Sequence, residues 1–479
     1  MKKIILLLLV VLAIQSCKKG SVNSNTNNGT NTPTGSAGTL DSSFGTNGMA
    51  TISFGYNGDF SNAACLQTDG KILISGYTTP ANLGTSGCMA LLRLNADGTP
   101  DNSFGRNGRV INNIAGVVNN PYYFCEANAV AVLKDGKIII AGMSGGTSFA
   151  IAKYNTDGTL DNSFGTNGNL IETIDKNTTA YAYPTRLATA QSIYVQPDGK
   201  FIVSGLSQVP ISSGGYGSTP LKFAMVRYNP DGSRDNSFGV NGESLTVIDN
   251  GAFYDITEPT IYHGLDGYDK SSLIAGKNNS LVAVLSYTLS DIVLKFNSGG
   301  FADNSFGNYG MLAFTSDIPL LSTYSYNCGF HIPIAIQSNG NILLGGSKSN
   351  YSWNSFDNYF GVSLTQTGAL DNSFANNGFY ITTIDNGNQA IGAVAVQSTG
   401  KIVFSGGGNN PSDTSIRNIA VGRLSTTGAV DTTFGNAGIA LSHVSNYSSS
   451  QVLLIDTKDR IYLVTNTMDN KFMVIRYKG

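Results

Sequence analysis

The sequence is poor in charge, histidine and cysteine. Only 13% of its 479 residues are charged, and 29 Lys and Arg nearly balance 31 Asp and Glu. The net charge of −2 provides no basic surface for a phosphate backbone, so no nucleic-acid partner is expected. With 3 His, 5 Cys and no Cys-x-x-Cys motif, the sequence predicts neither a metal site nor a bound cofactor.

Glycine and aromatic residues are abundant instead. The chain contains 57 Gly, 23 Tyr and 23 Phe. Glycine permits tight turns, and aromatic residues favour strands. This composition therefore predicts a turn-rich, all-β protein rather than a helical bundle.

A nine-residue motif, which we call the signature, recurs along the chain. One copy reads LDNSFGTNG at 160–168. The seven copies contain Asp41, Asp101, Asp161, Asp235, Asp303, Asp371 and Asp431. The intervals between these residues are 60, 60, 74, 68, 68 and 60, and such a period indicates an array of one supersecondary unit.

Each unit reads as four strands, which we name A to D. In the unit at 126–175, an Ala-rich strand A leads through Asp135-Gly136 to an apolar strand B at 137–141. Strand C follows at 148–154, and after the signature comes strand D at 169–174, whose alternation predicts an edge strand with one wet face. Seven units predict one seven-bladed β-propeller of four-stranded antiparallel blades, with the small residues of strand A innermost.

The two ends of the array are complementary. The first unit holds a signature and a D strand near 49–54, whereas the last holds strands A, B and C without D. We therefore expect the N-terminal strand to complete the seventh blade and so close the ring, which removes an open sheet edge.

The repeats resemble the delta-60 or DUF5122-type β-propeller repeats of bacterial surface and secreted proteins. The resemblance rests on Asp-Gly-Lys after strand A, the Arg/Lys-Tyr/Leu-Asn end of strand C and Leu-Asp-x-Ser-Phe-Gly-x-x-Gly, and it covers nearly all of 38–479. It implies the fold but no activity, because the family has none assigned. Ala375 in place of the signature Gly and the degenerate fourth unit depart from the pattern.

The N-terminus predicts export and anchoring. Lys2 and Lys3 precede an eleven-residue apolar run, Ile4–Ile14, which is too short for a permanent membrane span. The following Ser16-Cys17 resembles the lipobox of bacterial lipoproteins, so the predicted regions are a signal peptide (1–16), a lipid anchor on Cys17 with a flexible linker (17–37) and the propeller (38–479). The expected location is the cell envelope, at the outer membrane. The alternative is an ordinary secretory signal with an incidental Cys.

The signature carboxylates admit a functional and a structural interpretation. Calcium needs several converging oxygens, and each copy offers one Asp. A ligand site rarely needs seven equivalent copies, whereas an architecture does. We therefore predict that each Asp accepts backbone N–H bonds in a turn, with Gly at positive φ and Phe as a packing wedge.

Strand parity separates the two faces of the disc. The A–B turns and the signatures share one face, the signature face, and the B–C loops and D–A crossings share the other, the loop face. The loop face carries the length variation, and its Tyr-rich segments suit sugar stacking or protein contact, unless they merely pad the loops. The candidate ligand-binding residues are Tyr122, Tyr123, Tyr181, Tyr183, Tyr254, Tyr262, Tyr268, Tyr324, Tyr326 and Trp353.

The leading functional hypothesis is a monomeric, lipid-anchored, non-catalytic module that binds a glycan or a protein. Propellers also carry polysaccharide lyases and glycosidases, which need paired carboxylates, and a purely structural envelope protein is a third possibility. The carboxylates available for catalysis on the loop face are Asp249, Glu258, Asp266 and Asp269.

The remaining cysteines are expected to be buried thiols. Cys65 and Cys88 belong to strands A and C of one unit, which strand B separates, so a disulfide between them is unfavourable. Cys125 and Cys328 complete the set.

Overall fold

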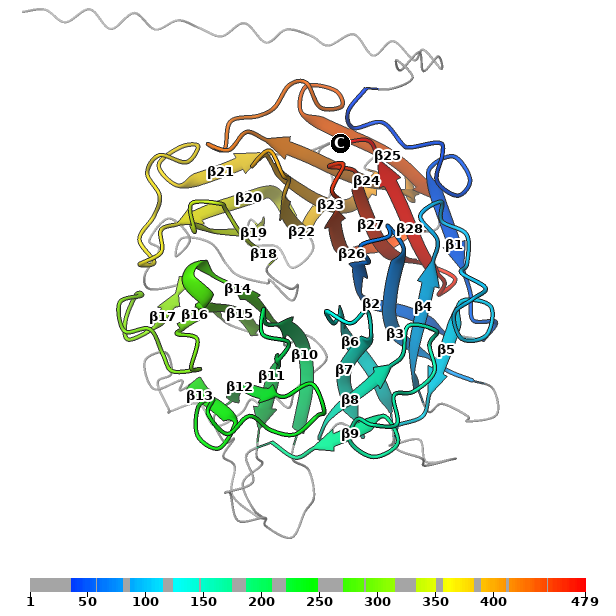
Figure 1. Ribbon diagram of the computed structural model, residues 1–479. Coiled ribbons are helices and arrows are strands. Elements are labelled where there is room, and N and C mark those ends of the chain that lie inside the picture. The colour runs from blue at the N-terminus through cyan, green and yellow to red at the C-terminus, as the bar shows by residue number, and fades with distance from the viewer. Residues whose placement is uncertain are drawn as a thin grey trace, which may run out of the picture. The chain divides into compact units, whose positions relative to one another are not determined.

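The computed structural model describes residues 36–56, 58–80, 87–114, 124–145, 148–174, 187–208, 221–248, 270–287, 290–314, 333–349, 356–382, 389–410, 413–445 and 447–479. These residues lie in one compact unit, Gly35–Gly479. Seven four-stranded antiparallel sheets are arranged around a centre (Figure 1).

The blades follow the chain order. Blade 1 contains β2 (Asp59–Leu66), β3 (Ile72–Thr78), β4 (Cys88–Leu94) and β5 (Arg109–Asn112). Blade 2 contains β6 (Cys125–Val132), β7 (Ile138–Ser144), β8 (Ser148–Tyr154) and β9 (Asn169–Glu172). Blade 3 contains β10 (Leu187–Val195), β11 (Phe201–Gln208), β12 (Leu221–Tyr228) and β13 (Glu243–Ile248). Blade 4 contains β14 (Lys270–Ala275), a 3-10 turn at Lys277–Asn279, β15 (Leu281–Tyr287), β16 (Ser290–Phe296) and β17 (Met311–Ala313).

The last three blades repeat the pattern. Blade 5 contains β18 (Ile334–Ile336), β19 (Ile342–Ser349), β20 (Phe356–Leu364) and β21 (Phe379–Thr382). Blade 6 contains β22 (Gln389–Val396), β23 (Ile402–Asn410), β24 (Asp413–Leu424) and β25 (Ile439–Ser445). Blade 7 contains β26 (Tyr447–Ile455), β27 (Ile461–Thr467), β28 (Phe472–Tyr477) and, from the other end of the chain, β1 (Met49–Ile52).

The ring closes as the sequence predicts. The first strands of the blades contact one another in order, from β2 through β6, β10, β14, β18 and β22 to β26, and β26 contacts β2. Strand A is therefore innermost. The N-terminal β1 pairs antiparallel with β28, with Met49 opposite Ile475 and Ile52 opposite Phe472. The prediction of a seven-bladed propeller closed by an N-terminal strand is confirmed.

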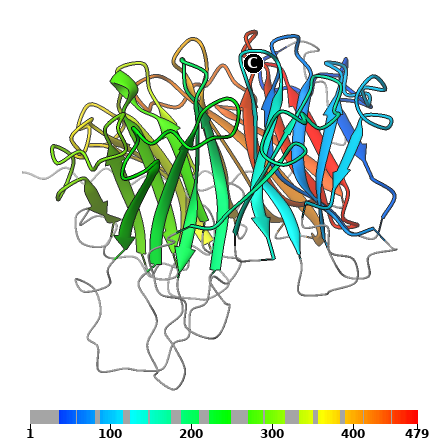
Figure 2. The same cartoon turned by 60° about the horizontal axis from the view of Figure 1, so that its bottom comes forward.

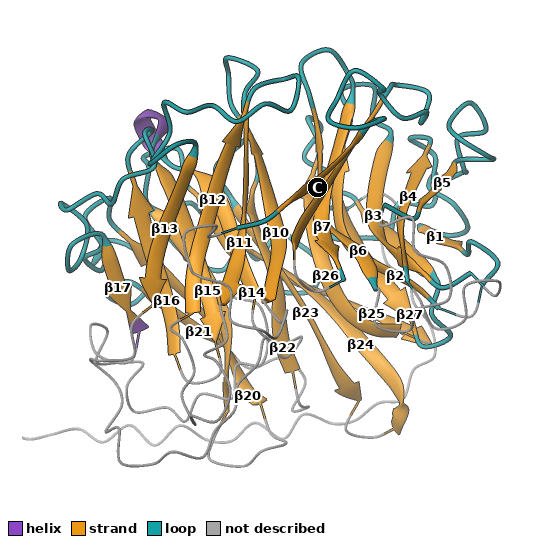
Figure 3. Cartoon of the chain, turned by 90° about the horizontal axis from the view of Figure 1, so that it is seen from below, coloured by secondary structure: helices purple, strands orange, loops and turns teal. Residues whose placement is uncertain are grey.

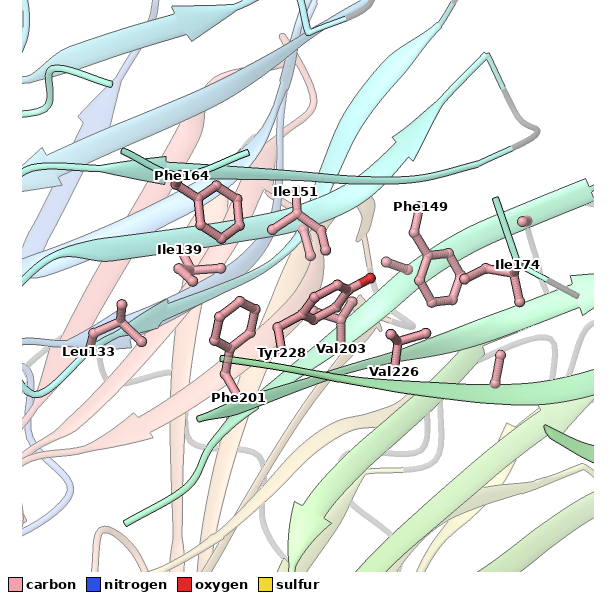
Figure 4. Packing of buried hydrophobic residues seen from close by; sticks show 14 residues of the cluster. Leu133, Ile139, Phe149, Ile151, Phe164, Ile174, Phe201, Val203, Val226 and Tyr228 are labelled. Carbon is pink, nitrogen blue, oxygen red and sulfur yellow. The ribbon is translucent and has the colours of Figure 1, made fainter. Parts of the chain in front are cut away.

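The hydrophobic core is divided among the interfaces between neighbouring blades. In the described chain, seven clusters of buried side chains each join two adjacent blades. Figure 4 shows the cluster between blades 2 and 3, where Phe164 and Ile139 face Phe201 and Tyr228. Each cluster contains one signature Phe: Phe44, Phe104, Phe164, Phe238, Phe306, Phe374 and Phe434. The signature therefore sets the contact between blades.

The two faces of the disc differ in their connections. In Figures 2 and 3 most of the described turns gather at one end of the strands. This end is the signature face. The turn with Asp135-Gly136 follows β6, and the signature at 160–168 follows β8. Both strands are antiparallel to β7 and so run in the same direction, which places the two turns at the same end of the blade.

The outer strands differ from the sequence expectation. Strand β9 was expected to turn polar residues to water, yet Ile171 is 49% exposed and Glu172 is 7% exposed. Glu172 tolerates burial because the Arg234 guanidinium of blade 3 lies 2.9 Å from its carboxylate. The prediction that the polar residues of β9 face water is therefore wrong for Glu172, because the ion pair with Arg234 of the next blade stabilises its buried carboxylate.

Candidate binding surface on the loop face

The ten aromatic residues predicted to bind a ligand lie outside the described residues. The same holds for Cys17, for Cys328 and for the four carboxylates considered for catalysis. The candidate surface described below is therefore built from other side chains on the same face, at the loop-face ends of blades 1 and 2.

Three aromatic rings pack at this place. Phe60 begins β2 and lies opposite Tyr77 of β3, and their rings stack with centroids 4.8 Å apart. The ring of Phe124, just before β6, meets Tyr77 edge to face at 4.7 Å. All three side chains are half-buried. The cluster thus presents partly exposed aromatic surface at β2 and β3 of blade 1 and at the start of β6 in blade 2.

A carboxylate lies beside these rings. Glu126 of β6 is half-buried, and its Oε1 accepts a hydrogen bond from Asn128 Nδ2 at 3.1 Å. Burial, and secondarily the charge of Glu126, raise the pKa of the Tyr77 phenol to about 12. The phenol therefore stays protonated and can donate a hydrogen bond at neutral pH.

Side-chain amides connect the inner strands around this carboxylate. Asn62 Nδ2 of blade 1 donates to Asn128 Oδ1 of blade 2 at 3.0 Å, and Asn128 Nδ2 also lies 3.2 Å from Thr189 Oγ1 of blade 3. In the next interface Gln191 Oε1 accepts from the backbone N–H of Ser271 at 2.7 Å. Glu126 is consequently held by a network that spans three blades.

β-bulges place these amides. The pairing registers of β2, β6 and β10 shift at Asn62, Asn128 and Gln191, so that each amide is the extra residue of a bulge. The bulge brings the strand A backbone close to strand B, where a Cβ on Gly142 would lie 1.9 Å from the carbonyl oxygen of Glu126. Glycine is therefore required opposite the bulge in blade 2.

The signature carboxylates form a separate, repeated arrangement on the opposite face. In blade 1 Asp101 Oδ1 accepts from the backbone N–H and the hydroxyl of Ser103, at 3.0 and 2.7 Å. The hydroxyl-bearing residue two positions later makes the same pair of bonds to Asp41, Asp161, Asp235, Asp303, Asp371 and Asp431. Each Asp thus organises its own turn.

The other oxygen of each signature Asp faces a cation in six blades. Arg93 Nε, near the end of strand C, lies 2.7 Å from Asp101 Oδ2, and its guanidinium stacks 4.3 Å from the centroid of Phe104. The equivalent cation–carboxylate pairs are Arg476–Asp41, Lys153–Asp161, Arg227–Asp235, Lys295–Asp303 and Arg423–Asp431. Sequence reasoning missed this partner, although Arg or Lys recurs eight residues before the Asp in five of these six blades.

The same cations reach the next blade. Arg93 donates to the carbonyl of Thr156 in blade 2, Lys153 donates to Pro230 in blade 3, and Arg227 donates to Ser298 in blade 4. The arrangement therefore clasps consecutive blades together rather than forming an open ligand site.

Blade 5 departs from this arrangement. Its strand C carries Ser363 in place of the cation, and Asp371 accepts from Ser363 and Asn341. Ala375 replaces the signature Gly with φ 45, a left-handed conformation that favours glycine. Blade 5, which carries Ala375 in its signature, is thus also the blade whose signature Asp has no cationic partner among the described residues.

The protonation of the described groups follows their partners. Burial opposes ionisation of Asp101, but the bonds from Ser103 and Lys71 and the charge of Arg93 hold the pKa of its carboxyl well below the usual range. Burial, with the neighbouring Cys125, raises the pKa of the Cys88 thiol to about 11. Cys88 is therefore an unreactive buried thiol at neutral pH.

Within the described residues, no group of three or more His, Cys, Asp or Glu side chains could hold a metal ion. The part of the chain that the structure describes also contains no helix long and apolar enough to cross a bilayer.

Fold and repeat together define the class of protein, a β-propeller built from one signature-bearing unit. Residues 67–104, 133–164 and 196–238 match the model of the family described as "Domain of unknown function (DUF5122) beta-propeller". Three segments of the chain thus match the model of this propeller family, in agreement with the resemblance seen in the repeats. None of the curated proteins matches it.

Several solved structures show a distant similarity. Virginiamycin B lyase from Staphylococcus aureus is 10% identical with a TM-score of 0.43, covering 89% of this chain and 98% of the lyase. YCF48 from Cyanidioschyzon merolae is 10% identical with a TM-score of 0.42, covering 89% and 98%. An ulvan lyase of polysaccharide lyase family PL25 is 9% identical with a TM-score of 0.44, covering 90% and 96%. These scores are too low to bear on function.

Proposed function

We propose that this propeller is a lipid-anchored, non-catalytic binding module of the cell envelope that holds a glycan on its loop face. The observation that carries the proposal is the cluster of Phe60, Tyr77 and Phe124 beside the Glu126 carboxylate. Aromatic rings offer flat apolar area for a sugar ring, and a carboxylate accepts strong hydrogen bonds from hydroxyls.

The described residues give less support to an enzyme. Asp59, the other carboxylate at this end of blade 1, is fully buried, and its two oxygens accept bonds from Thr78 and Ser53 at 2.6 and 2.7 Å. A glycosidase requires two carboxyl groups that reach the same bond. Asp59 is unavailable for that role because its partners are inside the protein.

A glycan screen with the purified protein tests the binding role. Glu126→Gln keeps the acceptor for Asn128 but removes the charge, and we expect it to weaken glycan binding about tenfold without unfolding the ring. The matched control is Asp135→Asn, an exposed carboxylate that lies in the A–B turn of the same blade on the signature face. The pair Tyr254→Ala and Tyr262→Ala extends the test to the predicted aromatic segments. A screen in which wild type binds no glycan, or in which only Asp135→Asn loses binding, contradicts the proposal.

The anchor has its own test. Metabolic labelling with a fatty acid should mark the wild-type chain and not Cys17→Ser. Equal labelling of the two would show that Cys17 is not the attachment site.

A further inference from the structure

Three large apolar side chains are exposed together on the signature face. Val240 is 70% exposed, Phe301 is 54% exposed and Tyr309 is 80% exposed. Val240 and Tyr309 belong to the signatures of blades 3 and 4, and Phe301 follows the C–D turn of blade 4. We call these three residues the apolar patch.

The turns that carry the patch are joined. The backbone N–H of Gly239 donates to the carbonyl of Gly299 at 2.8 Å, which links the signature of blade 3 to the C–D turn of blade 4. A Cβ on Gly310 would lie 3.0 Å from Ala302, so the residues next to Tyr309 and Phe301 are also in contact. The three side chains thus extend from one continuous group of turns.

The other repeats provide an internal comparison. In blade 2 the positions equivalent to Val240, Phe301 and Tyr309 hold Thr166, Thr159 and Asn167. Asn167 has φ 52, and Tyr309 has φ 51. A bulky residue in this left-handed conformation is unfavourable, so the turn gains nothing structural from Tyr309 over Asn. The fold does not require the apolar residues, which indicates a contact made outside the propeller.

Two cations next to the patch are paired within the protein. Arg234 pairs with Glu243 at 3.1 Å, and Lys295 pairs with Asp303 at 3.0 Å. A partner that contacts these three residues therefore meets apolar and aromatic side chains, and the cations of Arg234 and Lys295 are already paired. Tyr is typical of the interfacial layer of a membrane, because its ring is apolar and its hydroxyl is polar.

The start of the described chain lies on the same face. Gly38 donates its backbone N–H to the carbonyl of Lys478, and Gly435 donates to Ala37, so this segment takes the place of the C–D turn of blade 7. Blade 7 is opposite blades 3 and 4 in the closed ring, as the positions of β1 and β13 in Figure 1 show. The eighteen residues 18–35 can extend over at most about 60 Å, which keeps the face within reach of Cys17.

We infer that the signature face lies against the membrane that holds the anchor, with the apolar patch in the lipid interface and the loop face turned away. The inference rests on the lipid anchor of the proposed function. An attachment at blade 7 and a second contact at blades 3 and 4 support the disc at opposite sides, which lays this face along the bilayer.

Fluorescence quenching in vesicles tests this orientation. The lipidated full-length protein is reconstituted in phosphatidylethanolamine–phosphatidylglycerol vesicles with brominated acyl chains, and Trp353→Phe removes its sole Trp. Tyr309→Trp then reports on the signature face. Met468→Trp, at a 57% exposed residue in the turn between β27 and β28, is the matched reporter on the loop face.

We expect the bromolipid to reduce emission of the Tyr309→Trp protein about twofold and to leave that of the Met468→Trp protein nearly unchanged. Adding Val240→Thr and Phe301→Thr, the residues of blade 2, should remove most of the quenching at position 309. The orientation is wrong if only the Met468→Trp reporter is quenched. It is also wrong if neither reporter is quenched in protein that carries the fatty-acid label, and in both cases the lipid anchor itself is not contradicted. Absence of the fatty-acid label would instead refute the anchor, and the orientation with it.

Discussion

Arg93 Nε and Asp101 Oδ2 lie 2.7 Å apart, and both side chains are more than nine-tenths buried. The same guanidinium stacks on Phe104 and donates to a carbonyl of the next blade. One ion pair thus joins a turn, a core aromatic side chain and a blade interface. Its repetition in six blades explains how a chain with 13% charged residues concentrates several of them inside the ring.

Removing the charge of Asp101 should destabilise the propeller strongly. In Asp101→Asn the Ser103 hydroxyl keeps an acceptor, but Arg93 loses its carboxylate and Lys71 keeps only that of Asp69, at 3.6 Å. An unpaired buried charge costs about 3–5 kcal/mol of unfolding free energy. Chemical denaturation measures this loss. The control is Asp97→Asn, an exposed Asp four residues earlier whose side chain bonds only Thr99 of its own turn in the described structure, and it should change stability by less than about 0.5 kcal/mol.

The pH dependence of that loss has a defined sign. The pKa of Asp101 is lowered in the folded state, so its contribution is complete above the unfolded pKa of about 3.9 and disappears as pH falls through the folded value. The stabilities of wild type and Asp101→Asn should therefore converge only below about pH 4. A difference that vanishes near pH 6 would point to another cause.

Ala375→Gly should stabilise the protein. Ala375 has φ 45, and the six other signatures have Gly at this position with φ between 51 and 55. Removing the Cβ from a left-handed residue yields about 1 kcal/mol, to be measured by denaturation. The reverse change, Gly435→Ala, should be destabilising, because a Cβ there would lie 2.3 Å from the carbonyl oxygen of Ile439. If Ala375→Gly and Gly435→Ala change the free energy of unfolding in the same direction, the left-handed backbone conformation does not determine stability at this position.

The buried carboxyl of Asp291 should give the stability of the protein a second pH dependence, opposite in sign to that of Asp101. Its carboxyl is 3% exposed on β16, and burial raises its pKa to about 7 despite a hydrogen bond from Ser286. Because the folded pKa lies above the unfolded one, the group costs nothing below about pH 4, and stability decreases as pH rises from about 4 to 7. Asp291→Asn should remove this decrease and raise the melting temperature at pH 8. At pH 4 the variant and wild type should melt together.

The sequence predicted what is local and periodic. Seven copies of the signature determined the number of blades, and the incomplete first and last units predicted the pairing of β1 with β28. The partners of the signature Asp were missed because a turn separates Arg93 from Asp101, and pairing depends on side-chain directions that spacing alone does not give. A search for recurring cations would have found them.

The candidate site was predicted less well for a similar reason. Asn62, Asn128 and Gln191 stand among small residues of strand A, where alternation suggests a regular strand. The bulge that redirects them arises from contact with glycines of strand B, such as Gly142, and is therefore tertiary. Glu172 was assigned to the wet face because Arg234, its partner, comes 62 residues later from another blade.

The last prediction concerns the N-terminal segment, which stabilises blade 7 through side-chain contacts as well as through the hydrogen bonds of β1. Residues 38–54 also supply Phe44, fully buried between blades 7 and 1, and Asp41, whose carboxylate lies 2.9 Å from Arg476. Deleting them exposes the edge of β28 and leaves Arg476, 2% exposed, without a counter-ion. Loss of a buried charge partner and of a buried Phe each cost about 3–5 kcal/mol, so the free energy of unfolding should fall by at least about 5 kcal/mol.

Denaturation followed by circular dichroism measures this fall, and size-exclusion chromatography should show association through the open edge. Deleting residues 18–35 instead shortens the chain by a similar length but removes no described contact. That control should unfold at the same denaturant concentration as wild type. If the chain without 38–54 also unfolds there and remains monomeric, blade 7 is stable with three strands, and the ring does not depend on closure by β1.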